Sequence, residues 1–189
     1  TDRGTRSYLL RDGHEPRFLG ENRLSLIAKD LAPTAPITYT ARDGLTIHGY
    51  LTLPVGAAPQ RLPTVLLVHG GPWARDRWGD GATSRAMQQF LANRGYAVLQ
   101  VNYRGSSGYG RNHMEKARGE FAGRMHDDLV DGVRWAVERG VADPQRVAIY
   151  GASYGGYSAL VGATFTPEVF ACAVDVVGVT DIARLLEAA

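Results

Sequence analysis

The spacing of apolar and polar residues changes along the chain, and the changes predict alternating strands and helices. Residues 64–68 (TVLLV) form an unbroken apolar run, typical of a strand buried on both faces of a sheet. Residues 84–94 instead place Met87, Phe90 and Leu91 at helical spacing. The same reasoning predicts strands at 37–40, 45–53, 64–68, 96–101, 146–150 and 172–177, and helices at 84–94, 127–139, 153–164 and 181–189. This order predicts an α/β fold, a mostly parallel sheet with helices on both faces and an antiparallel pair at its start.

The first thirty residues follow another pattern. Two short apolar stretches flank Asp12-Gly13, which predicts a β-hairpin. Two strands alone are marginally stable in water, so this hairpin needs another surface to pack on. Residues 31–36 (LAPTAP) are punctuated by prolines and predict a linker. We therefore expect residues 1–30 to be the end of a preceding domain with its linker, and residues 31–189 to form a second domain.

The composition excludes several classes of protein. Hydrophobic residues make up 44% and charged residues 21%, the ordinary globular balance. The net charge is only +2 and the basic residues are scattered, so we expect no nucleic-acid partner and no anionic membrane surface. The apolar runs are far shorter than the ~20 residues that span a bilayer, and the first residues do not resemble a signal peptide. The single cysteine, Cys172, allows no internal disulfide and indicates a cytoplasmic location.

The strongest chemical signal is the sequence GASYG at residues 151–155, a G-x-S-x-G motif. Here a predicted strand precedes the motif and a predicted helix follows it, which is the context of a nucleophile elbow. Such a turn holds its serine in a strained conformation above the sheet, and the flanking glycines avoid clashes between strand and helix. We predict Ser153 as the nucleophile. A glycine-rich turn that precedes a helix by chance is the alternative.

The second signal is HGGPW at residues 69–73, directly after the predicted strand at 64–68. Acyl transfer needs hydrogen-bond donors for the oxyanion, and in this arrangement one is the amide of Tyr154. The other is the amide of Gly70 or Gly71, in the loop after the strand. His69 invites assignment as the general base. We expect a structural role instead. In enzymes with a nucleophile elbow of this kind, the catalytic triad follows the chain order serine, acid, histidine, and His69 precedes Ser153.

Other polar segments predict less. The glycine-rich residues 102–111 fit neither common phosphate-binding motif, so we expect a loop at the rim of the active site. The five histidines lack metal-ligand spacing, and we expect neither a metal nor a cofactor. His126-Asp127-Asp128 is interpreted as the N-terminal cap of the helix at 127–139, and Ser84 as the cap of the helix at 84–94.

Several blocks together resemble the catalytic domain of the prolyl oligopeptidase family of serine peptidases, most closely its acylaminoacyl peptidase and dipeptidyl peptidase types. These blocks are PITYTARDGLTIHGYLTLP (36–54), HGGPW (69–73), NYRGSSGYGR (102–111), MHDDLVDGVRWAVERGVADPQRVAIYGASYGGY (125–157) and FACAVDVVGVTDIARLLE (170–187). The resemblance implies an α/β-hydrolase fold and cleavage of short peptides. It implies Ser153 as nucleophile and the amides of Tyr154 and Gly71 as oxyanion hole.

The resemblance has two further implications. It places the substrate pocket around 179–186, with Val179, Ile182 and Leu185 as lining residues. It also implies that residues 1–30 are the last strands of a β-propeller, which excludes folded proteins from the site.

The chain departs from the family after its nucleophile. Only 36 residues follow Ser153, and all five histidines precede it. The family's acid and histidine follow a seventh and an eighth strand, whereas Asp175 and Asp181 lie before the expected position of the acid. We therefore expect a fragment of a larger peptidase, C-terminally incomplete and truncated after about the sixth strand. We expect it to be inactive alone, because a serine without a base is a poor nucleophile.

Two consequences follow from this expected truncation. The open sheet edge would pair with the missing C-terminal segment or with another copy. An esterase or lipase, and a non-catalytic fragment, remain alternatives to the peptidase.

Overall fold

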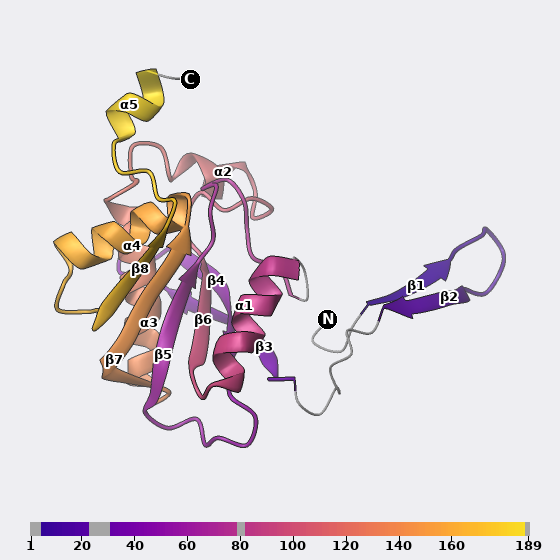
Figure 1. Ribbon diagram of the computed structural model, residues 1–189. Coiled ribbons are helices and arrows are strands. Elements are labelled where there is room, and N and C mark those ends of the chain that lie inside the picture. The colour runs from indigo at the N-terminus through magenta and orange to yellow at the C-terminus, as the bar shows by residue number, and fades with distance from the viewer. Residues whose placement is uncertain (1–4, 23–30, 79–81, 188–189) are drawn as a thin grey trace.

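The computed structural model describes residues 5–22, 31–78 and 82–187, and its core is one six-stranded sheet (Figure 1). A separate two-stranded hairpin of β1 (Thr5–Leu9) and β2 (Arg17–Asn22) precedes it. The strands of the sheet are β3 (Thr34–Thr40), β4 (Thr46–Thr52), β5 (Leu62–Val68), β6 (Ala97–Asn102), β7 (Ala142–Ala152) and β8 (Cys172–Val176). The helices are α1 (Ala82–Asn93), α2 (Arg111–Glu115), α3 (Arg124–Glu138), α4 (Tyr154–Phe165) and α5 (Ile182–Glu187).

The strand order β3-β4-β6-β5-β7-β8 makes the sheet antiparallel at one side and parallel in the rest. β4 pairs antiparallel with both β3 and β6. β5 pairs parallel with β6 and with β7, and β8 pairs parallel with β7. The predicted α/β class and the predicted antiparallel start are therefore confirmed.

Helices cover both faces of the sheet, as the alternating strands and helices predict. Leu66 and Val68 of β5 pack in the larger core cluster, together with apolar side chains of α3 and α4. Leu67 points to the opposite face and packs with α1. The burial of successive residues on opposite faces explains why residues 65–68 of this strand are all apolar. No helix within the described ranges is long and apolar enough to cross a membrane.

The N-terminal segments differ in how well the sequence predicts them. The predicted hairpin is present, and the rings of Tyr8 and Phe18 meet across it at 5.5 Å. The linker expected at 31–36 is wrong, because β3 already begins at Thr34. Ala32 is buried, and its amide and carbonyl bond the side chain of Gln89 on α1 at 2.8 and 3.0 Å. This contact between distant segments fixes a stretch whose prolines predict a linker.

The far side of the sheet ends in β8, which is exposed along its length. Val174 and Val176 of this strand are 41% and 36% exposed, and Val177 beyond it is 83% exposed. Within the described residues β8 pairs with β7 alone. The exposed edge that the sequence predicts is thus present in this part of the chain.

Candidate active site

Ser153 lies in a sharp turn between the last residue of β7 and the first residue of α4. Its φ and ψ are 57° and −119°, a region that non-glycine residues rarely adopt and that costs ~1–3 kcal/mol. Its amide donates to the carbonyl of Val176 at 2.9 Å, and its carbonyl accepts from the amide of Tyr157 at 3.0 Å. These bonds hold the strained turn, and they leave the serine side chain exposed at the end of the sheet.

Glycines allow strand, turn and helix to approach each other. A methyl group on Gly151 would overlap the backbone of Gly155, and one on Gly155 would overlap the carbonyl of Val68 in β5. One on Gly156 would overlap the Asp175 carboxylate. The glycines of the motif are therefore required by the close packing of α4 against β5, β7 and the turn after β8.

The HGGPW loop lies beside Ser153, because its strand β5 is the parallel neighbour of β7. Val68 is the register partner of Gly151, so both strands end at the same level. A methyl on Gly70 would lie 3.0 Å from the Ala152 carbonyl oxygen and 3.9 Å from the Ser153 Oγ. The structure thus brings the predicted residues of the oxyanion hole to the predicted nucleophile.

The backbone conformation at Gly71 and Tyr154 bears on their predicted role as oxyanion-hole donors. Gly71 has a φ of 125°, which favours glycine, and the loop turns tightly there, since its Cβ would lie 2.6 Å from the Trp73 amide nitrogen. Tyr154 is the first residue of α4, where the amides have no partner within the helix and carry the positive end of the helix dipole. The Tyr154 amide is therefore of the type that stabilises a developing negative charge, and the role of the Gly71 amide stays a prediction.

His69 has structural contacts and is not aimed at the nucleophile. Its Nδ1 lies 2.8 Å from the carbonyl oxygen of Gly70, so this nitrogen carries the proton and donates. Its Nε2 accepts from the Ser106 hydroxyl at 3.0 Å. Burial lowers the pKa of His69 below its ordinary value. These contacts agree with the structural role predicted for this histidine.

Tyr103 ties the HGGPW loop to the loop after β6. Its ring stacks on His69 at 4.4 Å with an interplanar angle of 16°. Its hydroxyl donates to the His69 carbonyl at 2.8 Å, and the side chain is fully buried. The amide of Ser107 donates to the carbonyl of Ala74 at 2.9 Å. Residues 102–111 therefore support the loop that carries Gly70 and Gly71.

The other four histidines come from the hairpin, β4, α2 and α3. His14 is in the loop of the hairpin, and His48 stacks on Tyr109 at 4.7 Å. The buried His113 donates from Nε2 to the Tyr103 carbonyl at 3.1 Å, and His126 Nε2 bonds the Thr166 hydroxyl at 2.9 Å. His48, His113 and His126 thus contact residues other than Ser153.

The two aspartates that follow Ser153 have local backbone partners. Asp175 accepts from the amide of Gly178 at 2.8 Å, and Asp181 accepts from the amide of Arg184 at 3.1 Å. Both acids are exposed. Their bonds close the turn after β8 and the first turn of α5.

The predicted substrate pocket is brought together only in part. A methyl on Gly156 of α4 would come within 2.8 Å of the Gly178 Cα, so the turn after β8 packs against the start of α4. The half-buried Val179 follows directly. Ile182 is the first residue of α5, which projects from the body of the domain in Figure 1. The side chain of Leu185 lies outside the described part. The pocket residues stay a prediction.

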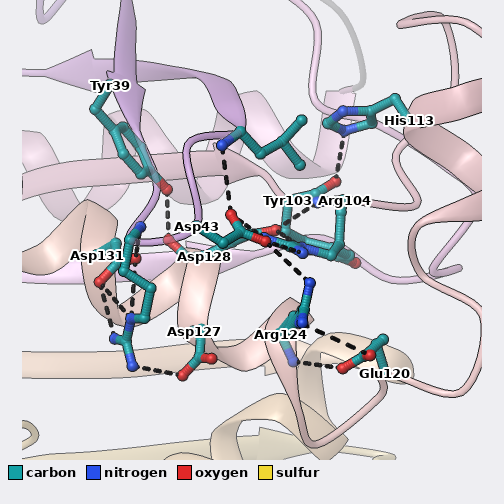
Figure 2. A network of polar contacts seen from close by, with 12 residues as sticks. Tyr39, Asp43, Tyr103, Arg104, His113, Glu120, Arg124, Asp127, Asp128 and Asp131 are labelled. Carbon is teal, nitrogen blue, oxygen red and sulfur yellow. Dashed lines mark hydrogen bonds and ion pairs between the residues drawn. The ribbon is translucent and has the colours of Figure 1, made fainter.

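A buried ion-pair network that the sequence pattern does not predict joins three segments of the domain (Figure 2). Arg104 and Asp128 are 2% and 0% exposed. Asp128 accepts from the Arg104 amide at 2.8 Å, from its Nε at 2.8 Å and from its Nη2 at 2.7 Å. Asp43 binds the other side of the same guanidinium at 2.8 and 3.1 Å. The network joins the turn after β3, the loop after β6 and α3.

The charges of this network shift its pKa values. Burial raises the pKa of Asp128, although the hydrogen bonds from Arg104 oppose this shift. The Arg104 hydrogen bonds lower the pKa of Asp43 to about 2. The pKa of Arg104 itself is raised, because its hydrogen bonds to both carboxylates outweigh the effect of burial. The guanidinium is thus charged at every physiological pH.

The cap predicted at 126–128 is wrong. α3 begins at Arg124, and its N-cap is Gly123 without a side-chain hydrogen bond. Asp128 therefore lies in the second turn and points inward to Arg104. A signal was present in the sequence: Met125, Leu129 and Val133 define the buried stripe of the helix, and Asp128 lies on that stripe. An acid in such a position indicates a buried ionic partner.

Comparison with known proteins shows the family to which the chain belongs. The model of the prolyl oligopeptidase family matches residues 82–188, and the chain belongs to this family. Dipeptidyl aminopeptidase BIII of Pseudoxanthomonas mexicana is 52% identical over 171 residues, which cover 87% of this chain and 24% of that protein. Dipeptidyl peptidase family member 6 of Caenorhabditis elegans is 42% identical over 173 residues, with 79% and 23% covered.

A solved structure agrees. A puromycin-hydrolyzing peptidase of Mycobacterium tuberculosis superposes with a TM-score of 0.82 and 28% identity over 92% of this chain and 27% of that one. The resemblance identified from the sequence and the α/β-hydrolase fold are thereby confirmed. The chain spans about a quarter of the length of these relatives.

Proposed function

We propose that the chain carries the nucleophile and the oxyanion hole of a serine peptidase that cleaves short peptides. The observation that carries the proposal is the strained Ser153 turn, with its φ of 57°, beside Gly70. In this mechanism the Ser153 Oγ attacks the carbonyl carbon of the scissile amide and loses its proton to a base. The amides of Tyr154 and Gly71 stabilise the oxyanion until the amine leaves and an ester to Ser153 remains.

The acid and the base of the triad are supplied, in this proposal, from outside the 189 residues. The five histidines support this proposal. Four of them contact residues other than Ser153, and His14 lies in the loop of the hairpin. A site with an oxyanion hole but no base retains only ~10³–10⁴-fold catalysis over water. The 189 residues alone are then inactive, and the complete site belongs to the longer peptidase.

A fluorophosphonate probe tests this function, because it phosphonylates only an activated serine. We expect the longer peptidase to gain one adduct by intact mass, and the Ser153→Ala variant to gain none. Ser107→Ala is the matched control, since Ser107 lies in the neighbouring loop and the variant keeps its backbone amide, which bonds the Ala74 carbonyl. An adduct that persists in Ser153→Ala would overturn the assignment of the nucleophile. Rapid labelling of the 189-residue chain by itself would overturn the external supply of the base.

The substrate class is tested separately from the nucleophile. An enzyme that forms the adduct but hydrolyses a short-chain ester and no peptide anilide would be an esterase on the same fold. We expect turnover of the anilide, because the chain's relatives carry peptidase names. A protein that binds peptide but hydrolyses neither the ester nor the anilide would be a non-catalytic domain.

A further inference from the structure

A row of aromatic rings leads from the protein surface to the residue after the nucleophile. Trp73 is 59% exposed, and its ring lies 6.4 Å from that of Phe121. Phe121 meets Tyr154 edge-on at 5.0 Å and 77°, and Tyr157 at 6.2 Å. Phe121 and Tyr157 are half-buried, so each presents part of its ring to solvent. We call Trp73, Phe121 and Tyr157 the aromatic surface.

Each member of the aromatic surface is tied to the candidate catalytic groups. Trp73 comes two residues after Gly71, and the tight turn at Gly71 fixes where its backbone lies. Tyr157 donates its amide to the carbonyl of Ser153 at 3.0 Å. Phe121 is fixed by the Tyr154 hydroxyl, which donates to its carbonyl at 3.1 Å. The aromatic surface therefore adjoins the segments that carry Ser153, Tyr154 and Gly71.

The aromatic surface and the predicted pocket approach the nucleophile from different strands. The turn after β8, which leads to Val179, packs on Gly156 of α4. Trp73 comes from the loop after β5, and β5 and β8 lie on opposite sides of β7. If the segment after β8 takes the acyl residue of the substrate, the flank along β5 is left for the residue that departs.

We propose that Trp73 and Phe121 form a subsite for an aromatic side chain on the leaving-group side of the scissile bond. The inference rests on the proposed peptidase function. Most of the Trp73 indole is exposed to water, and a substrate ring seated against it would remove apolar area from water and form an edge or offset-stacked pair. An aromatic pair of this kind corresponds to a preference of about tenfold over a small side chain.

Acyl transfer to added amines measures this subsite directly. An acyl-enzyme formed from a peptide ester is attacked either by water or by the amine of an amino-acid amide. In the second case the amine nitrogen bonds to the acyl carbon, the bond to Ser153 Oγ breaks, and the proton of the amine returns to Oγ through the base. The amine occupies the leaving-group side in this step, so the yield ratio for phenylalanine amide over glycine amide reports its binding there.

The experiment uses the longer peptidase and compares Trp73→Ala with Trp78→Ala. Trp78 is similarly exposed at 52% and lies in the same loop, but among the described residues it has no ring contact with Phe121. We expect a preference of about tenfold for phenylalanine amide in the unmodified enzyme and in Trp78→Ala. In Trp73→Ala the preference falls to about one, and Trp73→Phe restores part of it.

The outcomes separate the two proposals. An acyl-enzyme on Ser153 whose amine preference is the same in Trp73→Ala and in Trp78→Ala would overturn the subsite and leave the peptidase function intact. A peptidase that forms no acyl-enzyme on Ser153 would overturn the proposed function, and the subsite with it. A preference lost in both tryptophan variants would mean that the loop as a whole is disturbed, and would also contradict a specific role for Trp73.

Discussion

Replacement of Asp128 by asparagine tests its buried ion pair with Arg104. The substitution keeps the size of the side chain and removes the charge that faces Arg104, which is 2% exposed. Removal of one partner of a buried pair costs ~3–5 kcal/mol, because the other charge stays buried. Asp43 still binds the guanidinium through two hydrogen bonds, so we expect the lower limit, about 3 kcal/mol. For a chain of this size, that loss lowers the Tm by ~6–12 °C.

Urea and thermal unfolding of the full chain measure this loss. Asp127→Asn is the matched control, because Asp127 pairs with Arg42 where both side chains are substantially exposed, and such pairs contribute at most ~1 kcal/mol. Arg104→Met completes a double-mutant cycle with Asp128→Asn, and we expect a coupling above ~1 kcal/mol. The reasoning is refuted if Asp128→Asn costs no more than the control, or if the two substitutions add without coupling.

Three further predictions concern single contacts. Tyr103→Phe removes the 2.8 Å bond to the His69 carbonyl, and we expect kcat of the longer peptidase to fall about tenfold with KM unchanged; a change in KM alone would contradict a role in positioning the oxyanion loop. Gly155→Ala places a methyl against the end of β5 and costs ~3 kcal/mol in urea unfolding, whereas Gly20→Ala, with open space around it, changes the midpoint little. The pKa of Asp43, lowered to about 2, predicts a stabilising contribution that is complete above pH ~4 and lost as the pH falls toward 2; Asp43→Asn should flatten this loss in urea titrations.

The parts of the fold that follow local rules could be predicted from the sequence. Residues 64–68 are apolar because both faces of β5 are covered, and this run predicts a central strand. The turn at Ser153 could be predicted because its glycines are required within a few residues of each other. The HGGPW loop could be placed because parallel strands end at one edge of a sheet.

The parts that depend on distant contacts could not be predicted from local pattern. The prolines at 31–36 suggest a linker, but Gln89 of α1 fixes Ala32 from 57 residues away. Aspartate is common at helix N-caps, so the local sequence predicts a cap at Asp128. Its inward position depends on where α3 begins and on Arg104. Ser84 was expected to cap α1, yet the helix starts two residues earlier, at Ala82. Helix ends are set by a few weak contacts, so sequence patterns locate them less well than helix centres.

The pairing of β5 with β7 has a consequence for folding. Val68 and Gly151 are register partners although about 80 residues separate them, and the proposed nucleophile and oxyanion loop follow directly from these two strands. Pairings between distant segments form slowly, because the intervening chain must first lose its freedom. The proposed arrangement of Ser153 and the HGGPW loop therefore does not exist in any partly folded state that lacks this pairing. In refolding experiments, reactivity at Ser153 would return only with the closure of the central sheet, after the local helices have formed.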